Sequence, residues 1–190
     1  MQDAAAENWK YSDPENYDLR AAIAEHHGIP MDCIVVGEGI DGLLGLTCAL
    51  FVAPETNVVT TEGAYPTFNF HVLAHGGRVH AVPMSNFRED VLRLIETAKA
   101  INAPLIYVSN PNSPMGTWWT AGDVQSFIAM LPPQTLLVLD EAYCDTAPSG
   151  TAPPIDVSNP QVIRYRTFSK AYGLAGARIG YAVAERSTIE

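Results

Sequence analysis

The chain has 190 residues, of which 47% are hydrophobic and 17% are charged, and its formal net charge is −10. This length and composition are typical of one globular domain and argue against a disordered, fibrous or collagen-like chain. The acidic balance argues against nucleic acid and anionic membranes as partners, but it is compatible with a local basic pocket for an anionic ligand.

Helix-like and strand-like segments alternate along the first half of the chain. Glycine and proline residues punctuate the pattern, because they end helices and favour turns. The elements expected there, in chain order, are a helix at 19–27, a brief apolar strand at 34–36, a helix at 42–52, a strand at 57–61, a helix at 66–74 and a strand at 78–82.

The second half continues the same alternation. Its clearest helix has one apolar face, formed by Val91, Leu94, Ile95, Ala98 and Ile101. The elements expected there are a helix at 87–101, a strand at 105–108, a helix at 121–131, a strand at 136–139, a loop rich in Pro, Ser, Thr and Ala at 146–160, and strands at 162–168 and 179–184.

This order of elements predicts an α/β fold with three layers. Continuous apolar strands that alternate with helices indicate a mostly parallel sheet covered by helices on both faces. In such sheets, ligands bind in the crevice beyond the carboxyl ends of the strands. The segments expected at that edge are 109–116, 140–143 and 169–178.

Lys170 directly follows the strand that ends at Phe168, so it enters the ligand crevice. A lysine amine in such a place can act as a nucleophile. Position alone also allows a solvated lysine at a strand end.

Asp140 ends the apolar strand at 136–139. A carboxylate at the end of a buried strand is costly unless it has a partner. A ring N–H group that must stay protonated, a helix N-terminus, or a salt bridge to Arg164 or Arg178 are the alternatives that the sequence leaves open.

Two further segments have the character of anion sites. Arg178 lies among small residues at 173–180, which let the backbone approach a ligand closely, and its guanidinium can bind phosphate in a planar fork. Ser169 can add a hydroxyl to the same anion. The glycine-rich segment 37–42 leads into a helix, whose N-terminal N–H groups can bind phosphate. An ordinary surface arginine and an ordinary turn are the alternatives.

Taken together, these segments resemble the fold-type-I pyridoxal-phosphate (PLP) dependent aminotransferases, closest to the histidinol-phosphate aminotransferase group. The matching segments lie in the family's order along nearly the whole chain. They are Tyr65-Pro66-Thr67-Phe68, the loop 110–116, Asp140-Glu141-Ala142-Tyr143 and the segment 167–180 around Ser169-Lys170.

The resemblance implies three catalytic residues. Lys170 resembles the lysine that carries the cofactor as a Schiff base and later moves the α-proton. Asp140 resembles the partner of the pyridine nitrogen, whose charge keeps that nitrogen protonated. Tyr143 resembles the hydrogen-bond donor to the phenolic oxygen of the ring.

The resemblance also implies the remaining cofactor contacts. Ser169, Arg178 and the backbone of Ile40 and Asp41 resemble the phosphate cup. Phe68 resembles the aromatic platform stacked on the ring. Tyr11 resembles the tyrosine that reaches the phosphate of the neighbouring subunit, so a homodimer is implied. No metal site is expected, since His71 and His75 have no third ligand in the pattern.

One segment departs from the family's pattern. The family has Asn-Asn-Pro-Thr-Gly where this chain has Asn112-Ser113-Pro114-Met115-Gly116. The asparagine that contacts the phenolic oxygen aligns with Ser113. Ser113, Asn112 or a water molecule is therefore expected to make that contact.

The chain is also shorter than members of the family, which carry a small C-terminal domain with an arginine for the substrate carboxylate. Nothing in the sequence marks Arg186 as that arginine. We therefore expect residues 1–190 to be the PLP-binding large domain of a longer protein, unable to complete a substrate site alone. The substrates implied are an amino acid or related amine and a 2-keto acid.

Three other functions remain open. The same scaffold also serves PLP-dependent decarboxylases and lyases, which break a different bond at the α-carbon. A second alternative is a non-catalytic domain that senses PLP, although the intact set of Asp140, Tyr143, Lys170 and Arg178 argues against it. The third is a doubly wound domain without a cofactor.

The sequence indicates the cytoplasm as the compartment. Cys33, Cys48 and Cys144 are widely spaced and are expected to be free thiols in a reducing environment. No apolar run approaches the ~20 residues of a membrane span. The polar, acidic start of the chain lacks the features of a signal peptide.

Overall fold

The computed structural model describes residues 5–7 and 9–189. Within them, seven strands form one sheet in the order β1-β7-β6-β5-β4-β2-β3. The strands are β1 (Ile34–Gly37), β2 (Asn57–Thr61), β3 (Arg78–Val82), β4 (Leu105–Ser109), β5 (Leu136–Asp140), β6 (Val162–Thr167) and β7 (Gly180–Val183). Strands β2 to β6 pair in parallel, whereas β7 pairs antiparallel with both β6 and β1. The predicted mostly parallel α/β sheet is confirmed.

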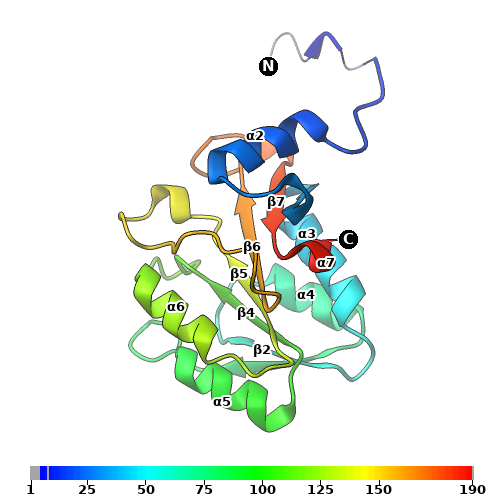
Figure 1. Ribbon diagram of the computed structural model, residues 1–190. Helices are drawn as coiled ribbons and strands as arrows, with labels where there is room; N and C mark the ends of the chain where they lie inside the picture. Colours follow the sequence, from blue (N-terminus) through cyan, green and yellow to red (C-terminus); the bar gives the residue numbers. More distant parts are fainter. Residues whose placement is uncertain (1–4, 8, 190) are drawn as a thin grey trace.

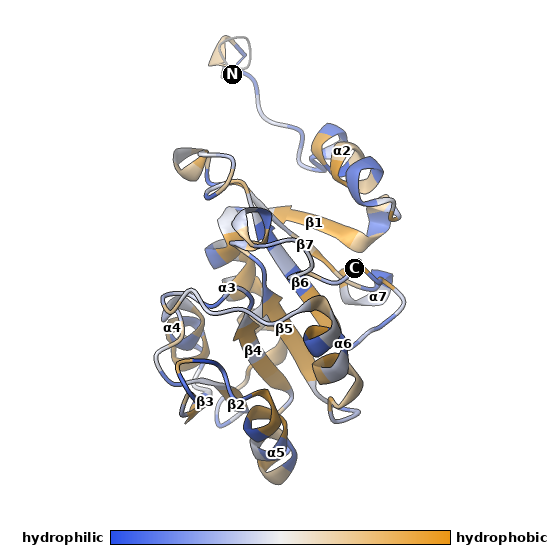
Figure 2. Cartoon of the chain, turned by 90° about the vertical axis from the view of Figure 1, so that its left-hand side faces the viewer, coloured by the Kyte–Doolittle hydropathy of each residue, from blue (hydrophilic) through white to orange (hydrophobic). Residues whose placement is uncertain are grey.

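Helices cover both faces of the sheet, as Figures 1 and 2 show. Helices α3 and α4 pack on one face, and α5 and α6 pack on the other. The helices are α2 (Tyr17–His27), α3 (Gly39–Phe51), α4 (Thr67–Ala74), α5 (Val91–Ile101), α6 (Ala121–Ala129) and α7 (Arg186–Ile189), with short 3₁₀ turns η1 (Met31–Cys33), η2 (Cys144–Thr146) and η3 (Ala175–Ala177).

Alternate residues of the central strands supply the two halves of the core. Tyr107 and Val138 point toward α3 and α4, whereas Ile106 and Leu137 point toward α5 and α6. Successive side chains of a strand point to opposite faces, so a strand buried on both faces is apolar except where its polar groups have buried partners. Figure 2 shows β4 and β5 coloured mostly hydrophobic.

Two helices begin three or more residues away from the predicted start. Helix α5 begins at Val91, not at 87, because the Asp90 side chain accepts a hydrogen bond from the backbone N–H of Arg93 and caps the helix there. Helix α3 begins at Gly39, three residues before the predicted start at 42. The earlier start places the first turn of α3 beside the cavity described below.

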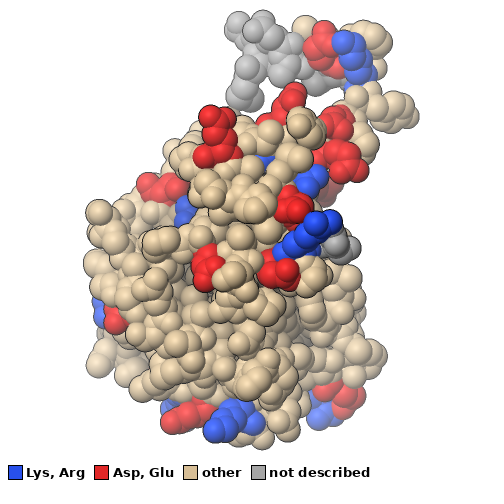
Figure 3. All heavy atoms as spheres, viewed as in Figure 1, with Lys and Arg blue, Asp and Glu red and all other residues tan. Residues whose placement is uncertain are grey.

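Charged side chains are sparse over the middle of the face drawn in Figure 3 and gather toward the end that carries α2 and along the lower edge. None of the helices in the described part of the chain has the length and apolar character needed to cross a bilayer.

Candidate active site

A cavity of about 170 Å³ lies where β4, β5 and β6 end and α3 begins. This is the carboxyl edge of the parallel strands, where ligands of such sheets bind. Most of the residues in its wall are polar or charged, together with a few apolar ones. The lining residues are Ile40, Asp41, Leu44, Tyr65, Thr67, Ser109, Pro111, Ser113, Asp140, Ala142, Tyr143, Thr167, Ser169, Lys170, Ala175 and Arg178.

Asp140 is the buried acid of this cavity, with 5% of its surface exposed. Its Oδ2 accepts a hydrogen bond from the Tyr107 hydroxyl at 2.8 Å, and its Oδ1 accepts one from the backbone N–H of Ala142 at 2.9 Å. Burial raises the pKa of the Asp140 carboxyl, and the Tyr107 hydrogen bond opposes this rise. A cationic partner in the cavity would stabilise the ionised form.

Lys170 lies on the loop between β6 and β7 and is exposed. Its Nζ lies 5.2 Å from the centre of the Tyr143 ring. The backbone N–H of Gly173 donates to the carbonyl of Lys170, so a turn fixes the lysine backbone. The amine and the phenol therefore face the same space, with Asp140 at its base.

A candidate anion site lies where α3 begins and β7 approaches it. A Cβ atom on Gly180 would lie 2.8–2.9 Å from backbone atoms of Gly39 and Ile40, so glycine is required for this approach. Arg178 reaches the same place, since its Nη2 lies 2.8 Å from the position of a Cβ on Gly39. A guanidinium beside the free N–H groups of a helix N-terminus is an arrangement that binds phosphate.

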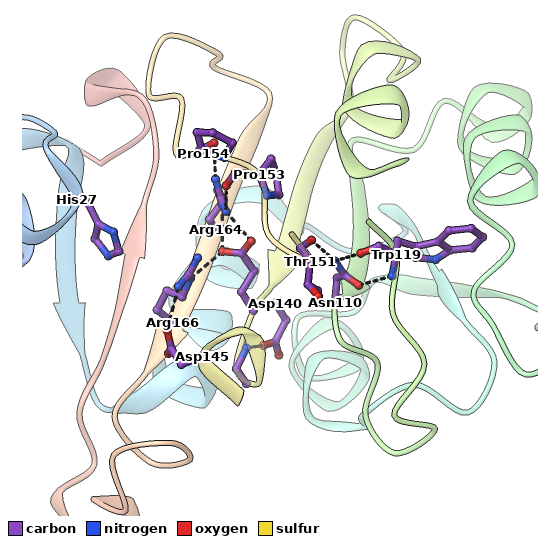
Figure 4. A network of polar contacts seen from close by, with 12 residues as sticks. His27, Asn110, Trp119, Asp140, Asp145, Thr151, Pro153, Pro154, Arg164 and Arg166 are labelled. Atoms are coloured by element: carbon purple, nitrogen blue, oxygen red, sulfur yellow. Dashed lines mark hydrogen bonds and ion pairs between the residues drawn. The ribbon is translucent and has the colours of Figure 1, made fainter. Parts of the chain in front are cut away.

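A buried ion network supports the turn that follows Asp140. Glu141 is 1% exposed and accepts hydrogen bonds from Arg164 (2.6 and 3.0 Å) and Arg166 (2.8 Å). Arg166 also contacts Asp145 at 3.3 Å. Figure 4 shows both arginines beside Asp140 and Asp145, with His27 on the far side. Arg164 therefore pairs with Glu141 and not with Asp140, which leaves the Asp140 carboxylate available to a ligand.

His27 closes this network on the side of α2. It contacts the Tyr181 hydroxyl at 2.8 Å, and burial together with the charge of Arg166 lowers its pKa to about 4. His27 is thus neutral at physiological pH and adds no charge near the site.

The structure brings most of the predicted site residues to one cavity. The predicted residues that line it are Ile40, Asp41, Ser113, Asp140, Tyr143, Ser169, Lys170 and Arg178. The three groups on which the hypothesis depends, the amine of Lys170, the acid of Asp140 and the guanidinium of Arg178, are all among them.

Asn112 does not line this cavity. It is buried, and its amide Nδ2 donates to Glu89 Oε1 at 2.9 Å while its Oδ1 accepts from the backbone N–H of Met115. Both ends of the amide are therefore engaged within the loop. Ser113, the other protein residue considered for the contact with the phenolic oxygen, does line the cavity.

The expectation that Phe68 presents its ring to a ligand is not met in this arrangement. Phe68 is completely buried, and its ring stacks on Tyr107 with centroids 4.6 Å apart. Its position on the core side of α4 explains this. Tyr65, which precedes α4 and is half exposed, is the aromatic residue that lines the cavity.

Tyr11 also lies away from the cavity and is fully exposed. Residues 9–16 extend away from the sheet before α2 begins, at the top of Figure 1. Its predicted contact with a neighbouring subunit stays a prediction.

Some lining residues were not identified by reasoning from the sequence, among them Thr67 and Thr167. Thr67 is notable because its Oγ1 is buried and has no hydrogen-bond partner among the described residues. Its place in the Tyr65-Pro66-Thr67-Phe68 segment was the available signal. An unpartnered hydroxyl in a cavity wall indicates a polar ligand.

Residues 2–190 match the profile of the family described as Aminotransferase class I and II. Histidinol-phosphate aminotransferase 1 of Nitrosococcus oceani is 35% identical over 182 residues, which cover 93% of this chain and 48% of that protein. The histidinol-phosphate aminotransferase of Lactiplantibacillus plantarum is 33% identical over 190 residues, which cover 94% of this chain and 53% of that protein. The chain thus spans about half the length of these curated relatives.

Solved structures of an aminotransferase and of a decarboxylase are also similar to this chain. The histidinol-phosphate aminotransferase of Sinorhizobium meliloti, in complex with pyridoxal-5'-phosphate, is 54% identical and superposes with a TM-score of 0.97 over 99% of this chain and 52% of its own. The L-threonine-O-3-phosphate decarboxylase of Porphyromonas gingivalis is 21% identical, with a TM-score of 0.83 over 99% of this chain and 59% of its own, and shares the fold.

Proposed function

Because the chain belongs to the class I and II aminotransferase family, we propose that it is the cofactor-binding part of a pyridoxal 5'-phosphate dependent aminotransferase. The enzyme moves an amino group between an amino acid or related amine and a 2-keto acid, with the cofactor bound covalently to Lys170. One observation carries the proposal: Lys170, Asp140 and Arg178 line a single cavity at the carboxyl edge of the sheet.

The cavity wall suits the phosphate of this cofactor. Arg178 provides the guanidinium, Ser169 a hydroxyl, and the first turn of α3 at Ile40 and Asp41 the backbone N–H groups. The side chain of Asp41 pairs with His71 of α4 at 3.1 Å, which supports a role for its backbone and not for its carboxylate. The unpartnered hydroxyl of Thr67 fits a further hydrogen bond to the same ligand.

The other half of the wall suits the ring. Asp140, buried and already accepting two hydrogen bonds, would bind the ring nitrogen and hold it in its protonated form. Tyr143 and Ser113 line the same cavity, and the Tyr143 hydroxyl would donate to the phenolic oxygen. When bound, the cofactor supplies an electron sink for the bond that breaks at the α-carbon of the substrate.

Lys170 has two tasks in this proposal. Its amine would hold the cofactor and, when free, would accept the α-proton of the substrate and give it back. Its location on a turn in the cavity wall supports both tasks, because the backbone of Lys170 is held beside the site.

Residues 1–190 are, in this proposal, the large domain, and a further segment supplies the groups that bind the substrate. This accords with the fraction of its relatives that the chain spans, about half. The names of those relatives make histidinol phosphate the first amino donor to test.

The test is the substitution Lys170→Ala in the full protein loaded with PLP. We expect the visible absorbance of the lysine-bound cofactor to disappear and the half-reaction with amino donors to slow by at least about 10³-fold. Lys99→Ala, on the exposed side of α5, is the matched control and should behave as the wild type. An unchanged visible spectrum in Lys170→Ala would reject the proposal.

We also propose that the enzyme is a homodimer in which Tyr11 reaches the phosphate of the neighbouring site. Tyr11 is fully exposed on a segment that extends from the body of the molecule. Helices α3 and α4 also present exposed apolar side chains, namely Leu46, Leu50, Phe70 and Leu73. Apolar side chains gathered in this way are typical of a surface that another chain covers.

The compartment proposed is the cytoplasm. Cys33, Cys48 and Cys144 are free thiols, and burial raises the pKa of Cys48 and Cys144 to about 12. Free thiols that stay protonated in this way are unreactive and accord with a reducing environment.

A further inference from the structure

Tyr107 is a completely buried residue of β4 whose hydroxyl reaches the acid of the cavity. Its Oη donates to Asp140 Oδ2 at 2.8 Å. Tyr107 lies opposite Val138 in the parallel pair of β4 and β5, so its side chain and that of Asp140, two residues after Val138, share one face of the sheet. The strand register therefore places this donor beside the carboxylate.

The ring of Tyr107 has little freedom to move. Phe68 stacks on it with an interplanar angle of 13°, and both rings belong to the core between the sheet and helices α3 and α4. Burial, and next the charge of Asp140, raise the pKa of Tyr107 well above its usual value. The hydroxyl is thus a permanent donor, since it does not ionise at any working pH.

The Asp140 carboxylate still has capacity for a ligand. A carboxylate offers about four lone-pair sites. Within the described residues, one donor contacts each of its oxygens, Tyr107 at Oδ2 and the backbone of Ala142 at Oδ1. The remaining sites can accept a ring N–H group from the cavity.

We propose that Tyr107 is a positioning residue of the aminotransferase reaction, whose hydroxyl orients the Asp140 carboxylate and keeps it ionised against a protonated ring nitrogen. The inference rests on the proposed function. Tyr107 does not line the cavity, so it acts only through Asp140.

The charge of Asp140 is set by several neighbours, and Tyr107 is the strongest of those that favour the ionised form. Burial raises the pKa of Asp140, and the hydrogen bond from Tyr107 is the first of the effects that lower it. The other titratable groups that interact with Asp140 are Glu89, Glu141, Tyr165 and Lys170. Without the Tyr107 donor, the carboxylate competes for the proton of the ring nitrogen, and the ring becomes a weaker electron sink.

The test is Tyr107→Phe in the full protein loaded with PLP, because this change removes one hydroxyl and keeps the stacked ring. We expect the ¹⁵N shift of the labelled ring nitrogen to move toward the unprotonated value. The pH at which the visible absorbance of the Lys170-bound cofactor changes should rise by about 1 unit. The maximal half-reaction rate should fall about 10- to 100-fold, with the affinity for the amino donor unchanged.

Tyr165→Phe is the matched control. Tyr165 is similarly buried on β6, on the other side of β5 from Tyr107, but its hydroxyl contacts Thr47. The control should lose a similar amount of stability while its ring-nitrogen shift and absorbance titration stay as in the wild type. If Tyr107→Phe also titrates as the wild type while retaining its cofactor, the inference is overturned.

A second variant covers the case in which Tyr107→Phe does not fold. Replacement of Tyr107 alone by 3-fluorotyrosine keeps the ring and makes the hydroxyl a stronger donor, so the absorbance transition should move to lower pH. No movement, or movement to higher pH, overturns the inference. A wild-type protein without any Lys170-dependent absorbance would instead reject the proposed function, so the two failures are distinguishable.

Discussion

At the scale of single residues, the two central groups of the cavity differ in their exposure to solvent. Lys170 is exposed on a loop, whereas Asp140 is buried at a strand end and depends on hydrogen bonds for its charge. A buried carboxylate stays ionised only where hydrogen-bond donors or cations stabilise its charge. Asp140 is therefore the residue at which a small chemical change should have the largest effect on catalysis.

We expect Asp140→Asn to slow the half-reaction by about 10²- to 10⁴-fold, because a neutral amide cannot keep the ring nitrogen protonated. Cofactor should still bind, since the anion site at Arg178 is untouched. Stopped-flow spectroscopy of the loaded protein measures both. Asp145→Asn changes a carboxylate of the following turn that does not line the cavity, and should leave the rate near that of the wild type. A full rate in Asp140→Asn would contradict the assigned role.

Glu89 is a second buried carboxyl, close to the loop that carries Ser113. Its Oε1 accepts from the Asn112 amide at 2.9 Å and from the backbone N–H of Ser109 at 3.3 Å, while its Oε2 is buried with no partner among the described residues. Burial raises its pKa from 4.5 to about 7. The folded protein therefore binds more protons at Glu89 than the unfolded chain between about pH 4.5 and 7.

Because the folded state binds more protons at Glu89, this residue should lower the free energy of unfolding as the pH rises through that window. The decrease should be on the order of 3 kcal/mol and should level off above the window. Glu89→Gln lacks this decrease, so its free energy of unfolding should rise relative to that of the wild type between pH 5 and pH 8. Urea unfolding at several pH values measures the difference. Glu96→Gln, on the exposed side of α5, is the control, and parallel curves for Glu89→Gln and the wild type would contradict the prediction.

Reasoning from the sequence identified the chemical groups of the site better than its apolar neighbours. Asp140 stands out because it ends a fully apolar strand, whereas Lys170 was assigned mainly because its segment resembles the family. Phe68 was assigned to the ligand because its segment resembles the family, but the sequence does not say that Tyr107 stacks on it. Asn112, one of three candidates for the contact with the phenolic oxygen, binds Glu89 instead, a partner that is distant in sequence.

At the scale of elements, the anion site depends on how closely α3 approaches β7. Gly39 has a φ of +74° and opens the first turn of α3, and Gly180 lets the two backbones meet. Left-handed backbone of this kind favours glycine. The pairing of a helix start with a strand start is thus fixed by two small residues.

We expect Gly39→Ala to weaken binding of PLP by about 10-fold or more, because the new Cβ would displace the Arg178 guanidinium. Gly28→Ala is a matched control, since Gly28 has a similar φ of +66° but no atom within 4 Å of its added Cβ. Both variants should lose ~1 kcal/mol of stability through backbone strain. Titration of the apoproteins with PLP separates the two, and equal affinities would contradict the assigned contact.

The strands were predicted more closely than the helix starts. The bounds at 57–61 and 78–82 agree with β2 and β3, because apolar runs between turn residues define a strand from both sides. Helix α5 was extended to 87 because the pattern does not show that Asn86 and Phe87 adopt positive φ. The antiparallel direction of β7 was not predicted, since the residues of a short apolar strand do not encode its direction.

At the scale of the whole molecule, the exposed apolar side chains of α3 and α4 bear on assembly. We expect the full protein to sediment as a dimer at micromolar concentration. Leu50→Glu places a charge among these side chains, so it should shift the protein toward the monomer. Leu92→Glu, an exposed leucine on α5, is the control and should remain dimeric. A stable monomer with a full complement of cofactor would contradict the proposed shared site.

The antiparallel direction of β7 determines which residues share the loop beside the cavity. Because β7 turns back beside β6, Lys170 and Arg178 lie on one short loop, whose ends are joined by the hydrogen bond from the Phe168 N–H to the Ile179 carbonyl at 3.1 Å. In the proposed function, Lys170 and Arg178 would therefore hold the cofactor from the same loop, one at its aldehyde end and the other at its phosphate. Arg178 would still bind the phosphate whenever the amine of Lys170 is free, so the loop would retain the cofactor throughout the reaction.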